Sequence, residues 1–298
     1  MSVANSSFIA ILEPYKAQVE HLIKSHLSYF GPDSELKSAC AYALLNGGKR
    51  FRPALVLMIA NALKNEVDVS HAALSVEFFH TASLIADDLP CMDNDDERRN
   101  KPTLHKVYGE SVALLTTYAL ISAGYAALAQ NAASFATSGH PMAHQSDRLC
   151  VLALENASYN TGILGATGGQ YLDLAPPDLS LATIREIIDK KTVTLFEISF
   201  VFGWIFGGGD LAFLPLVKKS AAHFGMAFQI ADDLDDMAQD KAHGQSLNLA
   251  NACGKESATI LFHNELKQFK ETLTLLNLSS TEFEAFCDLL SEQVIGVR

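Results

Sequence analysis

The sequence predicts an all-α fold, a single domain of helices packed around one core. Apolar residues recur at helical spacing along nearly the whole chain, and alternating runs typical of strands are few. Most Gly and Pro residues stand at the ends of the apolar stretches. With 298 residues, 49% of them hydrophobic, the chain can bury a large core. We therefore expect residues 1–298 to form one domain.

The breaks between helices follow the turn-forming residues. Gly31-Pro32 and Gly47-Gly48 separate the first three predicted helices, and Gly207-Gly208-Gly209 predicts a break after a long apolar stretch. The Ala-, Ser- and His-rich stretch 130–145 predicts a mobile loop. The predicted helices are 6–30, 35–46, 52–64, 70–89, 104–130, 147–165, 168–174, 180–206, 215–239, 256–276 and 281–295.

Composition argues against several classes of binding partner and of cellular location. The formal net charge of -12 argues against nucleic acid and anionic membrane surfaces, which attract clusters of Lys and Arg. The uncharged run 112–129 is long enough to span a membrane, but its Thr, Ser and Gly residues favour a buried core helix. Five widely spaced cysteines without metal-ligand spacing, and a start without a secretory pattern, predict reduced thiols in a cytoplasmic protein.

Two acidic clusters each follow a mostly apolar stretch. They are the segment Asp87-Asp88-Leu89-Pro90-Cys91-Met92-Asp93 and the segment Asp232-Asp233-Leu234-Asp235-Asp236. Unpaired carboxylates are costly to bury, so both clusters should face a shared wet cavity. Carboxylate oxygens suit Mg²⁺, which is usually held by one or two carboxylates and substrate phosphates. Each cluster alone is equally well explained as a solvated loop or helix terminus, but two together indicate a polyphosphate substrate.

Helical register places further side chains beside these carboxylates. His80 precedes Asp87 by seven residues and Ser83 precedes it by four, so all three share one helix face. Gln229 lies three residues before Asp232 on much the same face.

Basic groups form a second kind of candidate site. Gly47-Gly48-Lys49-Arg50-Phe51-Arg52-Pro53 combines glycines that let an anion approach the backbone with cations that bind phosphate, and Arg98-Arg99 adds two more cations. A helix end followed by a basic turn is the alternative. Lys190-Lys191-Thr192 opens an apolar segment and places one lysine where it can reach a buried anion.

Several segments match one family in order and spacing. They are Gly47 to Pro53, Asp87 to Asp93, Asn94-Asp95-Asp96-x-Arg98-Arg99, Lys106-Val107-Tyr108-Gly109-Glu110, Gly168-Gly169-Gln170-x-x-Asp173-Leu174, Lys191-Thr192 and Phe228-Gln229-Ile230-x-Asp232-Asp233. From about Leu44 to Lys255 the chain resembles the all-trans isoprenyl diphosphate synthases, especially bacterial farnesyl and geranylgeranyl diphosphate synthases. The resemblance implies a helical bundle around a deep central cavity, usually in a homodimer.

The resemblance also implies roles for individual residues. Metal binding falls to Asp87, Asp88, Asp93, Asp232, Asp233 and Asp236, with about three Mg²⁺ ions per site during turnover and Mn²⁺ as an alternative. Isopentenyl diphosphate would be held by Gly48, Lys49, Arg52, His80 and Arg99, and the allylic diphosphate by Arg98, Lys191, Thr192, Gln229 and Lys241. Lys255 competes with Lys241 for the last role. The chain departs from the family at Ala86, where His is usual, and at Val193, where Gly is usual.

The implied reaction joins the two diphosphates and needs no redox cofactor. The allylic substrate ionises, the isopentenyl double bond attacks the cation, and a proton is lost, while Lys191, Thr192 and Gln229 act as catalytic residues. We expect mainly farnesyl diphosphate, because overall similarity to the family favours it and Phe78 and Phe79 can supply the floor of the tail cavity. The small Ala82 and Ser83 keep geranylgeranyl diphosphate as the alternative. A class I terpene cyclase and a noncatalytic prenyltransferase subunit are further alternatives.

Overall fold

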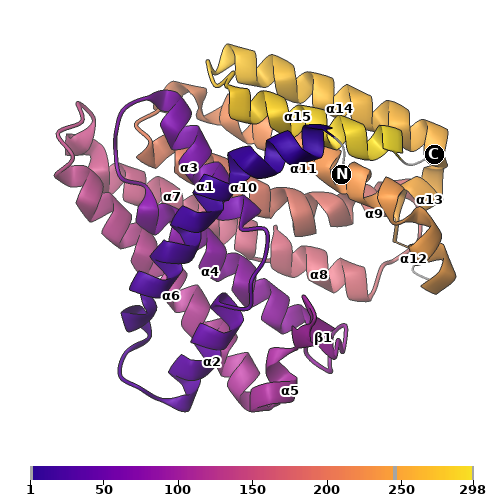
Figure 1. Ribbon diagram of the computed structural model, residues 1–298, viewed down its shortest axis with the longest axis horizontal. Coiled ribbons are helices and arrows are strands. Elements are labelled where there is room, and N and C mark those ends of the chain that lie inside the picture. The colour runs from indigo at the N-terminus through magenta and orange to yellow at the C-terminus, as the bar shows by residue number, and fades with distance from the viewer. Residues whose placement is uncertain (1–2, 244–246, 297–298) are drawn as a thin grey trace.

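The computed structural model describes residues 3–243 and 247–296, and these are almost entirely helical (Figure 1). The long helices confirm the predicted all-α class. In chain order the α-helices are α1 (Val3–Ser25), α2 (Glu35–Leu44), α3 (Phe51–Leu63), α4 (Ser70–Asp87), α5 (Leu104–Tyr108), α6 (Glu110–Ala136), α7 (Ser146–Thr161), α8 (Ala166–Leu174), α9 (Leu181–Ile188), α10 (Thr194–Phe206), α11 (Leu214–Asp235), α12 (Met237–His243), α13 (Leu249–Cys253), α14 (Lys255–Leu275) and α15 (Thr281–Gly296).

Shorter elements connect them. The 3₁₀ turns are η1 (Leu27–Phe30), η2 (Ala143–Gln145) and η4 (Leu211–Phe213), and η3 (Asp189–Val193) is a π-helical turn. Strands β1 (Glu97–Arg98) and β2 (Lys101–Pro102) pair antiparallel.

Several predicted boundaries were wrong. The helix expected at 104–130 is divided at Gly109 into α5 and α6, and α6 continues to Ala136. Buried Asn131 and Phe135 hold this last part of α6 against the core, so the first part of the expected 130–145 loop, up to Ala136, is helical. The helix expected at 215–239 ends at Asp235, and α12 follows. The hairpin and α13 were not predicted, because elements of two to five residues are too short to show apolar periodicity.

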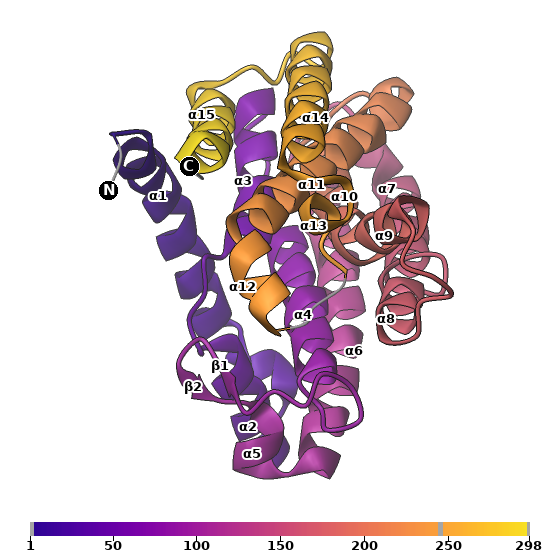
Figure 2. The ribbon, with the colours of Figure 1, turned by 90° about the vertical axis from the view of Figure 1, so that its right-hand side faces the viewer.

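Helix α10 lies at the centre of the packing. Apart from half-buried Glu197, its residues from Thr194 to Phe206 are all buried, and it contacts α3, α7 and α11. Helix α4 packs along α6, and the helices nearest the two ends of the described chain, α1 and α15, lie side by side (Figures 1 and 2). Phe51 at the start of α3 stacks on Phe286 of α15 at 4.6 Å between ring centres and joins these layers.

Helix α6 has two different faces. Its inner face packs against α4, whereas Leu114, Leu115, Tyr118 and Ile121 are exposed on its outer face. Among the described residues it is the one helix whose length and composition would allow a membrane span, and 44% of that apolar stretch is buried inside the protein. The expectation of a buried core helix therefore holds for one face only.

A buried arginine connects the N-terminal helices. Arg50 has a left-handed backbone (φ 50°), and its guanidinium pairs with Glu20 of α1 at 2.6 Å and with Glu77 of α4 at 2.5 Å. It also donates to the carbonyl of Leu44 at the end of α2. Burial raises the pKa of Glu77, and the charge of Arg50 opposes this shift. Arg50 thus fixes the basic turn that follows α2.

Replacing Arg50 tests this connection. Arg50→Met should destabilise the protein by about 3–5 kcal/mol, because Glu77 is left as a buried charge without its partner. Urea unfolding measures the loss. The double variant Arg50→Met/Glu77→Leu should recover much of it, while Lys37→Met, which breaks the exposed pair with Asp33, should cost less than about 1 kcal/mol. An equal loss in the single and double variants would contradict the buried-pair explanation.

Candidate active site

The basic turn brings three of the predicted diphosphate ligands together. Arg52 stacks its guanidinium over the ring of Phe196 at 4.5 Å, and its Nη1 lies 3.5 Å from Nε2 of His80. Lys49 is exposed beside them, close enough to Asp232 for its charge to affect that carboxyl. Burial lowers the pKa of Arg52 to about 10, with Glu77 and Asp232 opposing the shift. The group remains a cation at neutral pH.

His80 is neutral and has a defined tautomer. Burial, followed by the charges of Arg52 and Arg99, lowers its pKa well below the usual value. Because arginine only donates hydrogen bonds, Nε2 of His80 must be the acceptor, so its proton is on Nδ1. Both His80 Nδ1 and Arg52 Nε are buried without a partner. Two donors in this part of the site are therefore available for an acceptor such as a phosphate oxygen.

The β1–β2 hairpin places Arg99 over the glycines of the basic turn. Arg99 and Asn100, the two residues between the strands, both have positive φ, as a type I′ turn requires. The Arg99 guanidinium donates to the carbonyl of Gly47. A Cβ at Gly48 would lie 2.5 Å from Arg99 Nη1, so any other residue would displace the guanidinium, and the φ of 127° at Gly48 also favours glycine.

The first acidic cluster is divided between two environments. Asp88 is buried and pairs with Arg98, whose Nη2 lies 2.5 Å from Asp88 Oδ1. Asp87 and Asp93 lie near Lys191, whose charge lowers the pKa of both, as the charge of Arg98 does more weakly. Burial, opposed by the charge of Lys191 and aided by that of Asp93, raises the pKa of Asp87 to about 6. Burial also raises the pKa of Asp93.

The π-helical turn η3 connects the two acidic clusters. Lys191 pairs with Asp173 of α8 at 2.5 Å, beside the first cluster, while the Thr192 hydroxyl donates to Gln229 Oε1 of α11 at 2.9 Å. Helix α8 approaches η3 closely, since a Cβ at Gly169 would lie 2.6 Å from the backbone nitrogen of Lys191. Single π turns inside α-helices occur frequently at functional sites. Here the turn carries both predicted catalytic residues that precede α10.

The second acidic cluster lies on and after the last turn of α11. Asp232 accepts a hydrogen bond from Gln293 of α15 at 3.3 Å, and burial raises its pKa. Asp236 is exposed, and the neighbouring Asp240 and Asp235 add to the rise in its pKa that burial causes. Asp233 is 7% exposed, and burial raises its pKa to about 6.

Three residues at the site were not predicted. Asp173 and Gln170 lie within the Gly168 to Leu174 segment, whose match to the family motif could have identified them as site residues. The side-chain oxygen and nitrogen of Gln170 are both buried without a partner. Gln293 reaches Asp232 from a distant helix and gave no signal in the sequence. The predicted Lys241 is exposed on α12.

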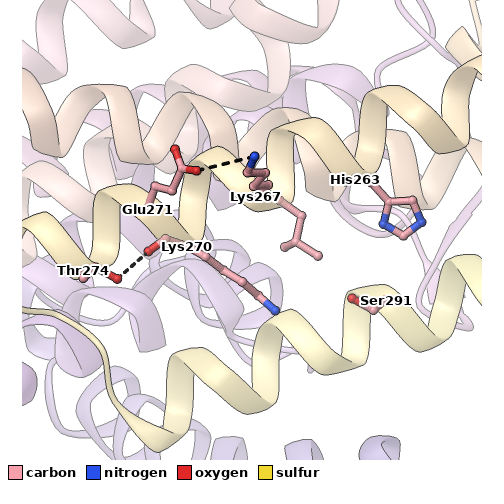
Figure 3. A pocket seen from close by; sticks show the side chains of 7 residues that line it. His263, Lys267, Lys270, Glu271, Thr274 and Ser291 are labelled. Carbon is pink, nitrogen blue, oxygen red and sulfur yellow. Dashed lines mark hydrogen bonds and ion pairs between the residues drawn. The ribbon is translucent and has the colours of Figure 1, made fainter.

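The acidic side chains do not form a closed cage. In residues 3–243 and 247–296, no group of three or more His, Cys, Asp or Glu side chains is placed to hold a metal ion by itself. A separate groove of about 400 Å³ between α14 and α15 is lined by basic, polar and apolar side chains (Figure 3). It contains none of the predicted site residues; its lining is His263, Leu266, Lys267, Lys270, Glu271, Thr274 and Ser291.

Comparison with known sequences identifies the family. A family model described as polyprenyl synthetase matches residues 33–286. The chain belongs to the polyprenyl synthetase family. A relative in this family, the heterodimeric geranylgeranyl pyrophosphate synthase large subunit 2 of Arabidopsis thaliana, is 35% identical over 91% of this chain and 72% of its own length. Geranylgeranyl pyrophosphate synthase 4 of the same plant is 36% identical over 80% of this chain, which spans 63% of that relative.

Solved structures agree with the polyprenyl synthetase assignment. An FPP/GFPP synthase of Zymomonas mobilis has a TM-score of 0.77 and 29% identity, covering 96% of this chain and 99% of its own. A geranyltranstransferase of Thermotoga maritima has a TM-score of 0.69 and 27% identity, covering 96% of this chain and 98% of its own. A geranyltransferase of Legionella pneumophila, at 24% identity and a TM-score of 0.79 over 98% of both chains, shows the common fold alone.

Asp87 should lower the folding stability of the protein when no cation is bound. Its pKa rises from 3.8 to about 6 on folding, so the charged form costs free energy that grows as pH rises from about 4 to about 6 and persists above. Asp87→Asn should therefore raise the melting temperature at pH 8 without divalent cations by about 2–4 °C, and by less at pH 5. Asp288→Asn, at an exposed position on α15, is the control. A lower melting temperature for Asp87→Asn at pH 8 would contradict this account.

Proposed function

We propose that this member of the polyprenyl synthetase family is a Mg²⁺-dependent short-chain trans-prenyltransferase, which joins isopentenyl diphosphate to an allylic diphosphate. The observation that supports this most is the presence of two separate charged sites. Unpartnered donors lie at the basic turn, and carboxylates without enough counter-charge lie on either side of η3. Two diphosphates, one bound with metal and one without, match these two sites.

The metal-free diphosphate is isopentenyl diphosphate in this proposal. His80 Nδ1 and Arg52 Nε would donate to it, and Lys49 and Arg99 would add positive charge. Gly48, on the same turn, lets the Arg99 guanidinium approach the backbone closely. Neutral His80 donates without adding charge to a group of cations that already repel each other.

The carboxylates suit Mg²⁺ as its ligands. Hard oxygen donors whose pKa burial has raised gain from a bound cation, and phosphate oxygens complete a shell that the protein leaves open. We propose Asp87, Asp93, Asp232 and Asp236 as the direct ligands, about three Mg²⁺ ions per site in turnover. Asp88 and Asp233 are already paired inside the protein and would support the ligands. Mn²⁺ is an alternative metal.

The allylic diphosphate would lie between the acidic clusters, held by Arg98, Lys191 and Lys241. Mg²⁺ held by the carboxylates would neutralise its charge. Departure of pyrophosphate leaves an allylic cation, which the Thr192 oxygen would stabilise, while Gln229 holds the Thr192 hydroxyl in place. The double bond of isopentenyl diphosphate supplies the electron pair of the new carbon–carbon bond. Loss of a proton, which pyrophosphate can accept, restores a double bond.

Product analysis tests the proposal against its alternatives. Purified protein with Mg²⁺ and isopentenyl diphosphate is incubated with dimethylallyl, geranyl or farnesyl diphosphate, and dephosphorylated products are separated by chromatography. A longer prenyl chain that forms only with isopentenyl diphosphate supports the proposal. Terpene cyclase activity would consume an allylic diphosphate alone, and a noncatalytic subunit would consume neither. The test for a noncatalytic subunit is informative because one relative is named as the large subunit of a heterodimer.

The product length depends on the face of α4 that approaches α6. Ala82 and Ser83 lie roughly one turn before Asp87, and Phe79 lies about 12 Å before it along the axis. The Phe79 ring packs on Tyr125 at 5.1 Å and closely against Gly124 of α6. We propose Phe79 as the floor. Farnesyl diphosphate was the product expected from the sequence, but the small Ala82 and the relatives named geranylgeranyl pyrophosphate synthases support the twenty-carbon product at least as well.

Substitutions at these two levels change the expected product in opposite directions. Ala82→Tyr should shorten the products, because a packed site cannot absorb a ring without strain. Phe79→Leu should lengthen them. Phe78→Leu is the matched control, since Phe78 packs against Tyr29 and Phe30 of η1 instead. Chromatography of the products decides, and an unchanged distribution in folded, active Ala82→Tyr enzyme would place the tail elsewhere.

The two diphosphate sites should separate in the kinetics. Lys49→Ala and Arg52→Ala should each raise KM for isopentenyl diphosphate about tenfold or more, because hydrogen bonds to charged groups contribute about 1.5–3 kcal/mol. KM for the allylic substrate should change much less. Lys37→Ala, which removes a lysine from α2, should change neither. Equal increases for both substrates would mean that the sites are divided incorrectly.

We further propose that the chain forms a homodimer through α6 and α7, residues 1–298 being one polyprenyl synthetase domain. The exposed Leu115 and Tyr118 of α6 and Val151 of α7 belong to helices that pack together, and contiguous exposed apolar surface marks an interaction site.

All five cysteines are free, which supports a reducing compartment such as the cytoplasm. Some relatives are named chloroplastic.

Charge on the outer face of α6 should prevent dimer formation. Leu115→Lys/Tyr118→Lys should convert a dimer to a folded monomer, because two charges would be buried between the subunits. Analytical ultracentrifugation measures the mass, and circular dichroism checks that the helices persist. Ile260→Lys, at an equally exposed apolar position on α14, should leave the dimer intact. A wild-type monomer would contradict the proposal.

A further inference from the structure

A chain of hydrogen bonds runs from the π turn to the start of α13. The Thr192 hydroxyl donates to Gln229 Oε1 at 2.9 Å, and Gln229 Nε2 donates to Asp233 Oδ1 at 2.8 Å. The other carboxylate oxygen, Asp233 Oδ2, accepts from the backbone N–H of Leu249 at 2.8 Å. Asp233 therefore has a partner on each oxygen.

The direction of these bonds is fixed by Asp233. An ionised carboxylate only accepts, so Gln229 must turn its NH₂ group toward Asp233 and its carbonyl oxygen toward Thr192. The Thr192 hydroxyl then has to donate its proton to that carbonyl. Its own oxygen keeps both lone pairs free, and these are the only groups it can present to a bound substrate.

The structure around Asp233 holds it in this role. Asn248 donates to the Asp233 carbonyl and to Asp240 Oδ2, both at 2.8 Å, and accepts from the Asn251 N–H at the same distance. Asn248 is 1% exposed and Asp233 is 7% exposed. By contrast, Asp236 on the same motif is exposed.

We infer that Asp233 is a positioning residue: through Gln229 it sets the polarity of the Thr192 hydroxyl, so that an oxygen rather than a hydrogen faces the allylic cation. The inference rests on the proposed prenyl transfer. It differs from the sequence-based expectation that Asp233 binds Mg²⁺ directly.

The isosteric variant Asp233→Asn tests the polarity. Its oxygen can still accept from Leu249, but its NH₂ then faces Gln229, which has to reverse its amide and turn the Thr192 hydrogen outward. We expect kcat to fall on the order of 10- to 100-fold, as when one oriented stabilising group is lost from a transition state. KM for both substrates and the Mg²⁺ concentration for half-maximal rate should change less than about twofold.

Two variants of the same motif serve as comparators. Asp232→Asn should raise the Mg²⁺ requirement, as expected of a direct ligand. Asp235→Asn, at an exposed position with no proposed role, should keep near wild-type activity. If a high Mg²⁺ concentration restores the activity of Asp233→Asn, or if the kcat of this variant equals that of wild type, the inference is overturned.

A double-mutant cycle distinguishes positioning from a general structural effect. In the Thr192→Val background, which lacks the hydroxyl, Asp233→Asn should lower kcat less than about twofold further. A full additional loss in that background overturns the inference. If Asp233→Asn does not fold, as judged by thermal melting, the cycle is run with Gln229→Met, which interrupts the chain and leaves the Asp233 to Leu249 bond intact.

A readout without turnover separates this inference from the proposed function. In the wild type, nuclear magnetic resonance should show slower hydrogen exchange at the side-chain amide of Gln229 than in Asp233→Ala, because a buried carboxylate holds that amide. Equal exchange overturns the bonding chain itself. A wild-type protein with slow exchange and no prenyl product would instead refute the proposed function.

Discussion

Ionisable groups placed inside an apolar helical bundle constrain the rest of this structure. On one side of the site, Arg50 is matched by Glu20 and Glu77, and Arg52 rests on the ring of Phe196. On the other side, Asp87 and Asp232 have too little positive charge near them, and burial raises the pKa of each. Excess donors and excess acceptors are thus kept apart by the helices that carry them. A ligand that contains both cations and phosphate oxygens supplies acceptors to the unpartnered donors and positive charge to the carboxylates.

The fold was predictable to the extent that each element is long and amphipathic or apolar. Helices such as α4 and α14 bury enough residues at helical spacing to be predicted, and runs of glycine marked the ends of α2 and α10. The π turn at 189–193 was not predictable, because a single wide turn leaves the apolar spacing on either side nearly unchanged. The hairpin depends on positive φ at Arg99 and Asn100, and arginine gives no signal for that conformation.

The candidate site was predictable by residue type but not by orientation. Asp87 and Asp88 are neighbours in the sequence, yet one residue turns a helix by about 100°, so Asp88 meets Arg98 while Asp87 faces Lys191 and Asp93. The same separation distinguishes Asp232 from Asp233. Gln293 joins Asp232 from α15, and only tertiary packing brings the two together. A motif therefore names the candidate carboxylates, and their partners decide which remain available.

The π turn has a consequence for how this part of the chain tolerates change in length. A π turn contains one more residue than the α-helical turn it replaces, and here it is continuous with α9 before it and α10 after it. Deleting one residue between 189 and 193 would restore a regular helix, with every backbone hydrogen bond satisfied. Because the π turn absorbs its extra residue within a single wide turn, α9 and α10 would keep nearly the same relative orientation, but the side chains of the turn itself would change direction. Lys191 and Thr192 would no longer face α8 and α11, respectively, so a local gain in regularity would separate the two halves of the site.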